Sequence, residues 1–206
     1  MLVFSGVLFS VMTHASQSGQ SPNIVVFLID DLRPDLGVYG HNQVHSPNID
    51  QLASEGVKFT RAYAQQAICG PSRVSIMTGL RPENTGLYTI RKNGRLRPNQ
   101  PNVVSMPQLF KANGYKTISI GKVYHSTTDD QENWSTHIKK LENFYAIDGN
   151  KEKRFAYEAG EVENDFYKDG KVAADAIRAL KELKDDKFLM FVGLSKPHLP
   201  FNAPKR

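Results

Sequence analysis

The chain has 206 residues, of which 40% are hydrophobic and 23% charged, and its formal net charge is +5. This is an ordinary soluble composition, and a chain of this length buries a sizeable core in one large domain or two small ones. A single cysteine excludes an internal disulfide and a thiolate metal cluster. No basic block or aromatic-interleaved basic stripe is present, so nucleic acid is not expected as a partner, whereas anionic substrates suit the mild positive charge.

The first twelve residues are apolar and uncharged, and Thr13, His14 and Ala15 then offer small residues where a signal peptidase cleaves. Residues 1–21 are therefore expected to be a secretory signal peptide with a polar linker, although a buried start of the fold is the alternative. A signal would place the protein outside the cell, in the periplasm or in a lysosome-like lumen. The segment is too short to span a bilayer, and no other stretch is a candidate for a membrane span.

Residues 23–29 form a continuous apolar run rich in β-branched residues, which predicts a parallel strand buried on both faces. Asp30 and Asp31 follow it directly. Ligands bind at the carboxyl ends of such strands, and paired carboxylates there need solvent or a compensating charge. A hard divalent cation would satisfy both, while a surface loop capped by the Asp pair is the plainer alternative.

The next elements are a short amphipathic helix and a strand. Ser46 is the expected N-cap of the helix, Pro47 suits its first turn, and Gly56 suits its end. Residues 57–64 alternate in polarity and predict a strand. His41 and His45 fall in the preceding loop and are expected to be loop residues rather than ligands.

The only cysteine, Cys69, lies at the mouth of a predicted helix that has Pro71 in its first turn and Gly79 at its end. The N–H groups and partial positive charge of a helix N-terminus suit a tetrahedral oxyanion. Arg73 falls one turn later on the same face. A sulfur nucleophile, an anion-binding helix start and a planar cation thus lie within a dozen residues, although a buried structural cysteine is the alternative.

The run C-x-P-S-R-x-x-x-x-T-G, from Cys69 to Gly79, resembles the signature of the sulfatase family in the alkaline-phosphatase superfamily. The resemblance implies that Cys69 is converted to Cα-formylglycine by a formylglycine-generating enzyme or an anaerobic sulfatase-maturing enzyme. It also implies that Asp30, Asp31 and the modified Cys69 bind Ca²⁺. Residues 46–59 resemble a further family stretch, for which a structural role is expected.

Residues 104–113 predict a helix and residues 115–120 a strand, after which come Lys122 and His125. Residues 126–168 are polar with scattered aromatics, and are expected either to cover the active face or to pack on themselves. Residues 172–183 have helical periodicity, and residues 187–194 predict another buried strand. That strand leads into K-P-H-x-P-F, which contains His198.

The elements G-K-V-x-H and K-P-H-x-P-F resemble the iduronate-2-sulfatase branch of the family most closely. The resemblance implies that Lys122 contacts the sulfate and that His125 hydrogen-bonds to the formylglycine hydrate. It implies that His198 contacts the bridging oxygen and protonates the leaving group. Arg73 would neutralise charge on the sulfate.

The element order predicts an α/β fold, and the resemblance implies an alkaline-phosphatase-like mixed sheet flanked by helices. Residues 22–206 are expected to be the N-terminal portion of a sulfatase catalytic domain, incomplete at its C-terminus and inactive by itself. The implied reaction is hydrolysis of sulfate esters on a sulfated carbohydrate. The alternatives are a phosphoester or phosphonate hydrolase of the same superfamily, or a non-catalytic glycan-binding fragment.

Overall fold

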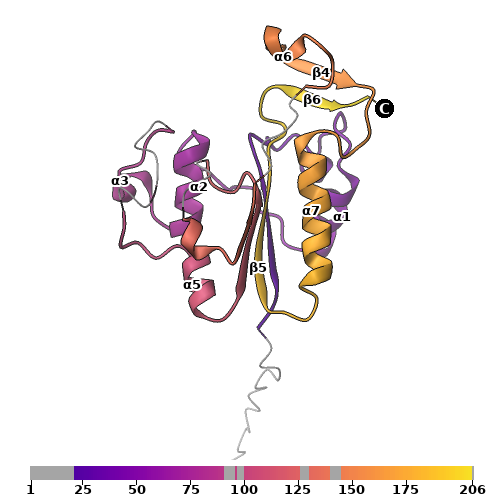
Figure 1. Cartoon of the computed structure of the whole chain (residues 1–206). Helices are drawn as coiled ribbons and strands as arrows, with labels where there is room; N and C mark the ends of the chain where they lie inside the picture. The colour runs from indigo at the N-terminus through magenta and orange to yellow at the C-terminus, as the bar shows by residue number, and fades with distance from the viewer. Residues whose placement is uncertain (1–20, 91–95, 97–99, 126–129, 140–144, 206) are drawn as a thin grey trace, which may run out of the picture.

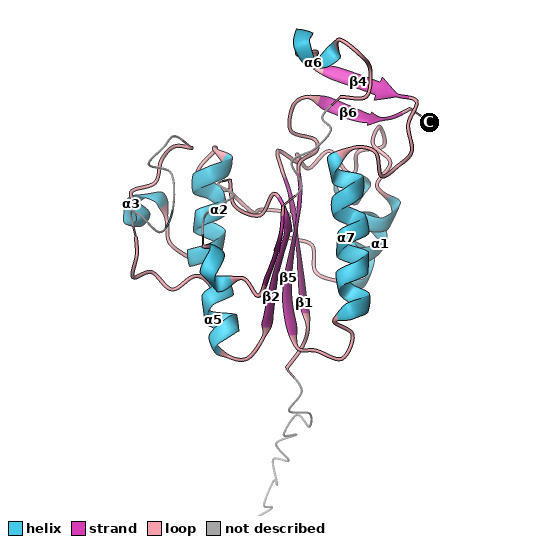
Figure 2. Ribbon diagram, viewed as in Figure 1, coloured by secondary structure: helices cyan, strands magenta, loops and turns pink. Residues whose placement is uncertain are grey.

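A four-stranded sheet lies between two helical layers in the computed structural model, which describes residues 21–90, 96, 100–125, 130–139 and 145–205 (Figures 1 and 2). All strand pairs of this sheet are parallel. The spatial order of the strands is β1 (Ile24–Ile29), β5 (Phe188–Leu194), β2 (Lys116–Gly121) and β3 (Thr136–Ile138). The α/β class predicted from the sequence is confirmed.

The helices form a layer on each side of the sheet (Figure 1). One layer contains α2 (Cys69–Thr78), α3 (Pro82–Thr85) and α5 (Met106–Ala112). The other contains α1 (Pro47–Glu55) and α7 (Lys168–Glu182). Helices on both faces bury most of the central strand β5, which explains its continuous apolar sequence.

Strand β5 is the centre of the core, because both of its faces are buried. Leu189 and Phe191 pack into an apolar cluster with α2, where Trp134 meets Phe191 edge to face with ring centroids 5.7 Å apart. Met190 and Val192 pack into a second cluster under α7. The two clusters hold the helical layers on the sheet and thereby fix where the strands end.

A small second sheet lies beyond the carboxyl ends of the main strands (Figure 2). It pairs β4 (Tyr157–Gly160) with β6 (Phe201–Pro204) in parallel, and α6 (Asn150–Lys153) precedes β4. The buried carboxylate of Glu158 accepts hydrogen bonds from the backbone N–H of Ile147, the Asn150 amide and the Tyr167 hydroxyl. This network ties together several positions in the second half of the polar insertion at residues 126–168.

Two short 3-10 helices, η1 (Gly37–Tyr39) and η2 (Gln131–Asn133), complete the described elements. Around η1, the Asp50 carboxylate accepts hydrogen bonds from the Ser46 hydroxyl and from the backbone N–H of Val38. Ser46 in turn accepts the backbone N–H of Gly37 at 3.0 Å. This part of the sulfatase-like stretch therefore braces the loop after β1, as the predicted structural role requires.

Two expectations about strands were wrong, and three short strands were not predicted. Residues 57–64 form a loop, because no described strand lies beside them to pair with. Strand β1 is at the edge of the sheet rather than buried on both faces, and the side chain of Phe27 is 57% exposed. The insertion contributes β3 and β4, and β6 follows β5, although the sequence predicted none of these short strands.

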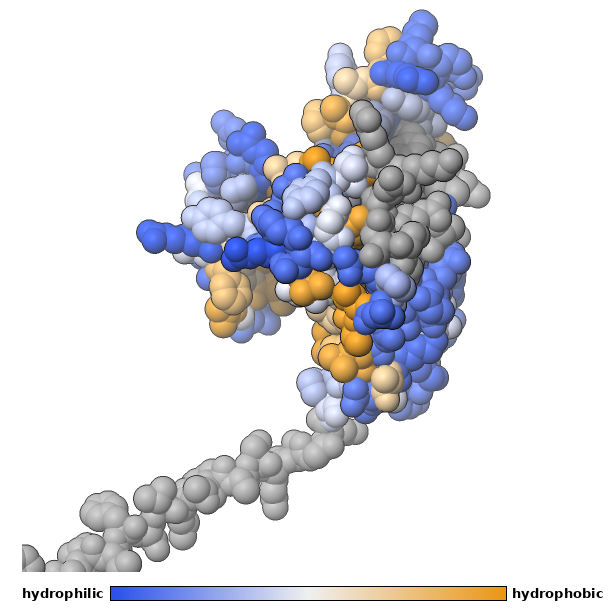
Figure 3. All heavy atoms as spheres, turned by 90° about the vertical axis from the view of Figure 1, so that its left-hand side faces the viewer, coloured by the Kyte–Doolittle hydropathy of each residue, from blue (hydrophilic) through white to orange (hydrophobic). Residues whose placement is uncertain are grey.

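The outer face of the layer containing α3 and α5 is a mixture of polar and apolar surface (Figure 3). Leu109 on α5, for example, is 53% exposed. The predicted signal peptide lies outside the described residues. Among the described helices, none combines the length and apolar character that crossing a bilayer requires.

Candidate active site

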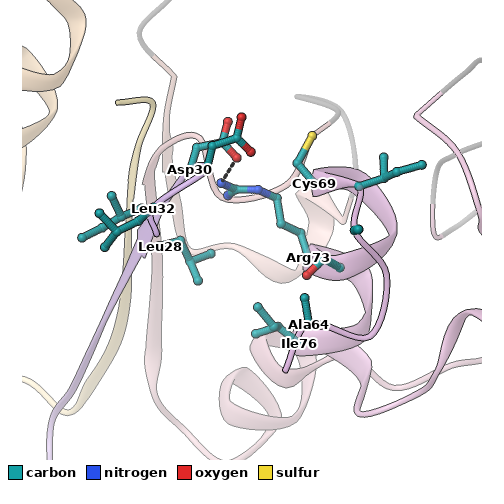
Figure 4. A pocket seen from close by; sticks show the side chains of 12 residues that line it. Leu28, Asp30, Leu32, Ala64, Cys69, Arg73 and Ile76 are labelled. Carbon is teal, nitrogen blue, oxygen red and sulfur yellow. Dashed lines mark hydrogen bonds and ion pairs between the residues drawn. The ribbon is translucent and has the colours of Figure 1, made fainter. Parts of the chain in front are cut away.

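The predicted site residues lie along one edge of the sheet. Strands β1, β2 and β5 are parallel neighbours, so their carboxyl ends share an edge, as in other open α/β sheets. A pocket of about 340 Å³ opens there between the end of β1 and the start of α2. Figure 4 shows Asp30 and Cys69 on opposite sides of this pocket with the Arg73 guanidinium between them.

Asp30 is the centre of a buried ion-pair network. Its Oδ1 accepts a hydrogen bond from Nη2 of Arg73 at 2.9 Å, and its Oδ2 pairs with the Lys122 ammonium. Arg73 also donates to the backbone carbonyls of Lys122 and Val123. One guanidinium therefore ties the first turns of α2 to the ends of both β1 and β2.

The network sets the charge of Asp30. Burial by itself raises the pKa of this carboxyl, but the hydrogen bonds and positive charges of Lys122 and Arg73 outweigh burial. The pKa of Asp30 is therefore held below its usual value. Asp30 is an anion at neutral pH, as a metal ligand has to be.

Asp31 differs from Asp30 in exposure although it is the next residue. It adopts a left-handed conformation, with φ of 57°, which turns the chain sharply after β1. Its side chain is 60% exposed and lies 3.8 Å from Nε2 of His198. The two carboxylates thus approach the pocket rim from different directions.

Cys69 is the first residue of α2, as the sequence predicts, and Gly79 ends the helix in a left-handed conformation. The preceding residue, Ile68, provides no side-chain cap. The N–H groups of the first turn are therefore not satisfied by a capping side chain, and the helix dipole places partial positive charge beside the half-buried sulfur.

Lys122 and His125 reach this edge through the turn after β2. Gly121 begins the turn with φ of +77°, and a Cβ there would lie 2.3 Å from the carbonyl oxygen of Gly193. His125 lies against the first turn of α2, because a Cβ added to Gly70 would be 3.6 Å from the Cβ of His125. Burial, and then the positive charge of Lys122, lowers the pKa of His125 despite the opposing charge of Asp30.

Comparison with known proteins identifies the family of the chain. A family model described as Sulfatase matches residues 22–206. The chain belongs to the sulfatase family. It is 40% identical over 219 residues to the iduronate 2-sulfatase of Mus musculus, a match that covers 96% of this chain and 39% of that protein. The resemblance to the iduronate-2-sulfatase branch is thus confirmed, and this sulfatase-family chain spans about two fifths of that relative's length.

Solved structures confirm the fold of this sulfatase-family chain. A 2-O GAG sulfatase superposes with a TM-score of 0.66 at 26% identity, covering 87% of this chain and 36% of that one. The phosphonate monoester hydrolase of Agrobacterium radiobacter superposes with a TM-score of 0.70 at 23% identity, covering 89% of this chain and 42% of that one. The second likeness concerns the fold alone.

Asp30 and Asp31 are the described residues that could hold part of a Ca²⁺ site. Carboxylate oxygens are the donors that Ca²⁺ prefers, and Asp30 and Asp31 supply them at the rim of the pocket. Calcium takes six to eight oxygen ligands, whereas the described part of the chain contains no cluster of three or more His, Cys, Asp or Glu side chains. The donor chemistry fits Ca²⁺, with further ligands needed to complete the coordination.

Three charged residues near the site were not predicted as functional. The Asp169 carboxylate accepts hydrogen bonds from the backbone N–H groups of Ser195 and Lys196, which lie just after β5. The pKa of Lys168 and that of Lys196 are both lowered, mainly by burial, with Lys122 adding to the effect in each case. The helix predicted from the sequence begins at residue 172 and so leaves Asp169 and Lys168 outside it, and a lysine inside K-P-H is not a specific signal.

Proposed function

We propose that this protein hydrolyses sulfate esters of a sulfated carbohydrate. The observation that carries the proposal is the intact run from Cys69 to Gly79, folded as a helix that begins at the pocket. Membership of the sulfatase family and the similarity to iduronate 2-sulfatase support it. Because the names of two relatives specify 2-sulfates, 2-O-sulfated glycosaminoglycan fragments are the first natural substrates to assay.

In this proposal, Cys69 is converted to formylglycine by a formylglycine-generating or anaerobic sulfatase-maturing enzyme. Once hydrated, the converted side chain supplies a hydroxyl nucleophile for sulfur, together with a second hydroxyl that a thiol lacks. Asp30 and Asp31 would contribute to holding Ca²⁺, which supplies positive charge beside the reacting oxygens. Residues 1–21 would direct the protein to the exterior, the periplasm or a lysosome-like lumen.

Arg73 and Lys122 bring two positive charges to the pocket, where the sulfate oxygens accumulate charge during reaction. Arg73 is fixed by Asp30 and two carbonyl groups, so its charge is preorganised before substrate arrives. Among the described residues, Lys122 makes one ion pair, with Asp30, and its side chain is 18% exposed. Lys122 is therefore the cation more able to turn from the carboxylate to a sulfate oxygen.

The two histidines suit different proton transfers. The lowered pKa of His125 keeps its imidazole neutral at neutral pH, so that it can accept a hydrogen bond or proton beside the first turn of α2. His198 lies on the outer rim near Asp31, with its side chain 41% exposed. That position favours donation of a proton to the departing sugar oxygen.

The proposal is tested with the full-length protein, co-expressed with a maturing enzyme. The mass of the Cys69 peptide reports conversion, because oxygen replaces sulfur and two hydrogens are lost. Turnover of nitrophenyl sulfate that disappears in Cys69→Ala, with the melting temperature retained, would support the assignment. Turnover of nitrophenyl phosphate or phosphonate in preference to sulfate would assign the alternative reaction, and glycan binding by unconverted protein without turnover would assign a binding role.

A further inference from the structure

The loop that carries His198 is not held in place by apolar packing. It follows β5 and spans residues 195–200. Leu199, its largest apolar residue, is 55% exposed. The ring of His198 makes one described hydrogen bond, from Nδ1 to the adjacent carbonyl of Leu199, and this bond moves with the loop. Among the described residues, the other close polar neighbour of the ring is the exposed Asp31 carboxylate, 3.8 Å from Nε2, so the position of His198 depends mainly on polar contacts to the loop backbone.

Asp169 supplies the contacts at the start of the loop. Its carboxylate accepts the backbone N–H of Ser195 at 2.8 and 2.9 Å and that of Lys196 at 2.7 Å. Asp169 lies in the first turn of α7, and Val172, one turn later, is fully buried against the sheet. The carboxylate thus attaches the loop to a helix that is itself fixed by the core.

Lys196 supplies the contacts at the far end. Its ammonium donates to the backbone carbonyl of His198 at 3.2 Å and to that of Pro200. Burial lowers the pKa of Lys196, while the nearby Asp169 carboxylate opposes this change and favours the charged form. Together with the hydrogen bond that the His198 backbone N–H donates to the Ser195 carbonyl at 3.1 Å, this side chain closes the loop on itself around His198.

We infer that Asp169 and Lys196 are positioning residues that hold His198 at the rim of the pocket. The inference rests on the proposed function, because it concerns the geometry of that site's proton donor. Both residues act on His198 through the loop backbone. A displacement of about 1 Å in a catalytic group costs on the order of a hundredfold in rate. Releasing either end of the loop lowers turnover accordingly.

The first experiment compares steady-state kinetics of the converted full-length protein on nitrophenyl sulfate. Asp169→Asn keeps the shape of the side chain but removes its charge and one acceptor oxygen, and Lys196→Met keeps the stem but removes the donors. Each should lower kcat at least tenfold and change KM less than twofold. The control Lys205→Met removes an exposed lysine whose ammonium pairs with Glu161 at 2.8 Å, and it should leave both constants unchanged.

The second experiment repeats both substitutions in the His198→Ala protein. Since the two residues act through His198, neither should lower the residual kcat further in that background. A further tenfold loss there would overturn the inference and assign them a general structural role. Wild-type kcat in both single variants would overturn it as well.

A third measurement does not require turnover. The ring signals of His198 in NMR spectra of substrate-free protein should shift in Asp169→Asn and in Lys196→Met, but not in Lys205→Met. If the wild-type protein hydrolyses no sulfate ester, the proposed function fails while these signals still test the positioning role. Unchanged His198 signals in both variants would refute that role. Lys196→Met provides the test if Asp169→Asn does not fold.

Discussion

The pair between Asp30 and Arg73 should contribute measurably to stability. Their side chains are 2% and 7% exposed and their closest atoms are 2.9 Å apart, so solvent screens the interaction little. Removing one partner of a buried pair costs about 3–5 kcal/mol. The Lys122 ammonium remains beside Asp30 in Arg73→Ala, which places the expected loss in the free energy of unfolding near the lower figure, about 3 kcal/mol.

A double-mutant cycle isolates this interaction. Urea unfolding of the full-length protein in a chelating buffer, followed by circular dichroism, would compare Arg73→Ala, Asp30→Asn and the double variant. The coupling energy should be about 2 kcal/mol, within the range for residues in direct contact. Arg33→Ala is the control, because Arg33 forms an exposed pair with Asp35 and such pairs contribute about 0–1 kcal/mol.

The coupling energy between Asp30 and Arg73 should also fall as the pH is lowered. Since the pKa of Asp30 is lowered in the folded protein, its pairing stabilises the fold above the ordinary value of 3.8. That contribution is lost as the pH falls through the folded pKa. The coupling should therefore be full at neutral pH and shrink below about pH 4. Additive effects at pH 7, within about 0.5 kcal/mol, would refute the reasoning.

Three further predictions concern single positions. Gly121→Ala should lower the free energy of unfolding by about 2 kcal/mol more than Gly149→Ala, because both glycines have φ of +77° but only Gly121 would also clash; equal losses in urea unfolding would contradict this. The NMR titration midpoint of His125 should lie below 6.5, and it should rise in Lys122→Met, which removes a positive charge. Because the pKa of His125 is lowered in the folded protein, its neutral form stabilises the fold. That contribution is complete above pH 6.5 and is lost as the pH falls through the folded pKa. A midpoint at or above 6.5 would contradict it. Asp31→Asn should weaken Ca²⁺ binding in calorimetry and change stability by under about 0.5 kcal/mol, because the side chain is exposed; unchanged affinity would remove Asp31 from the metal site.

The local chemistry of the site could be predicted from the sequence. The helix that begins at Cys69 and ends before Gly79 follows from Pro71 and Gly79, whose conformational preferences act over a few residues. Strand β5 follows from a continuous apolar run, and β2 from the alternating sequence of residues 115–120. Polar residues directly after such strands could likewise be assigned to one edge of a parallel sheet.

The tertiary structure decided which of those residues touch. Asp30 meets Arg73 and Lys122, which are 43 and 92 positions away, and no local pattern encodes contacts at that separation. The loop formed by residues 57–64 shows the same limit, because an alternating sequence forms a strand only where a neighbouring strand accepts its hydrogen bonds. Asp169 likewise reaches the loop of His198 only because α7 packs across the end of β5. Propensity and capping depend on adjacent residues, whereas ion pairs and strand pairing depend on where the packed core brings distant segments together.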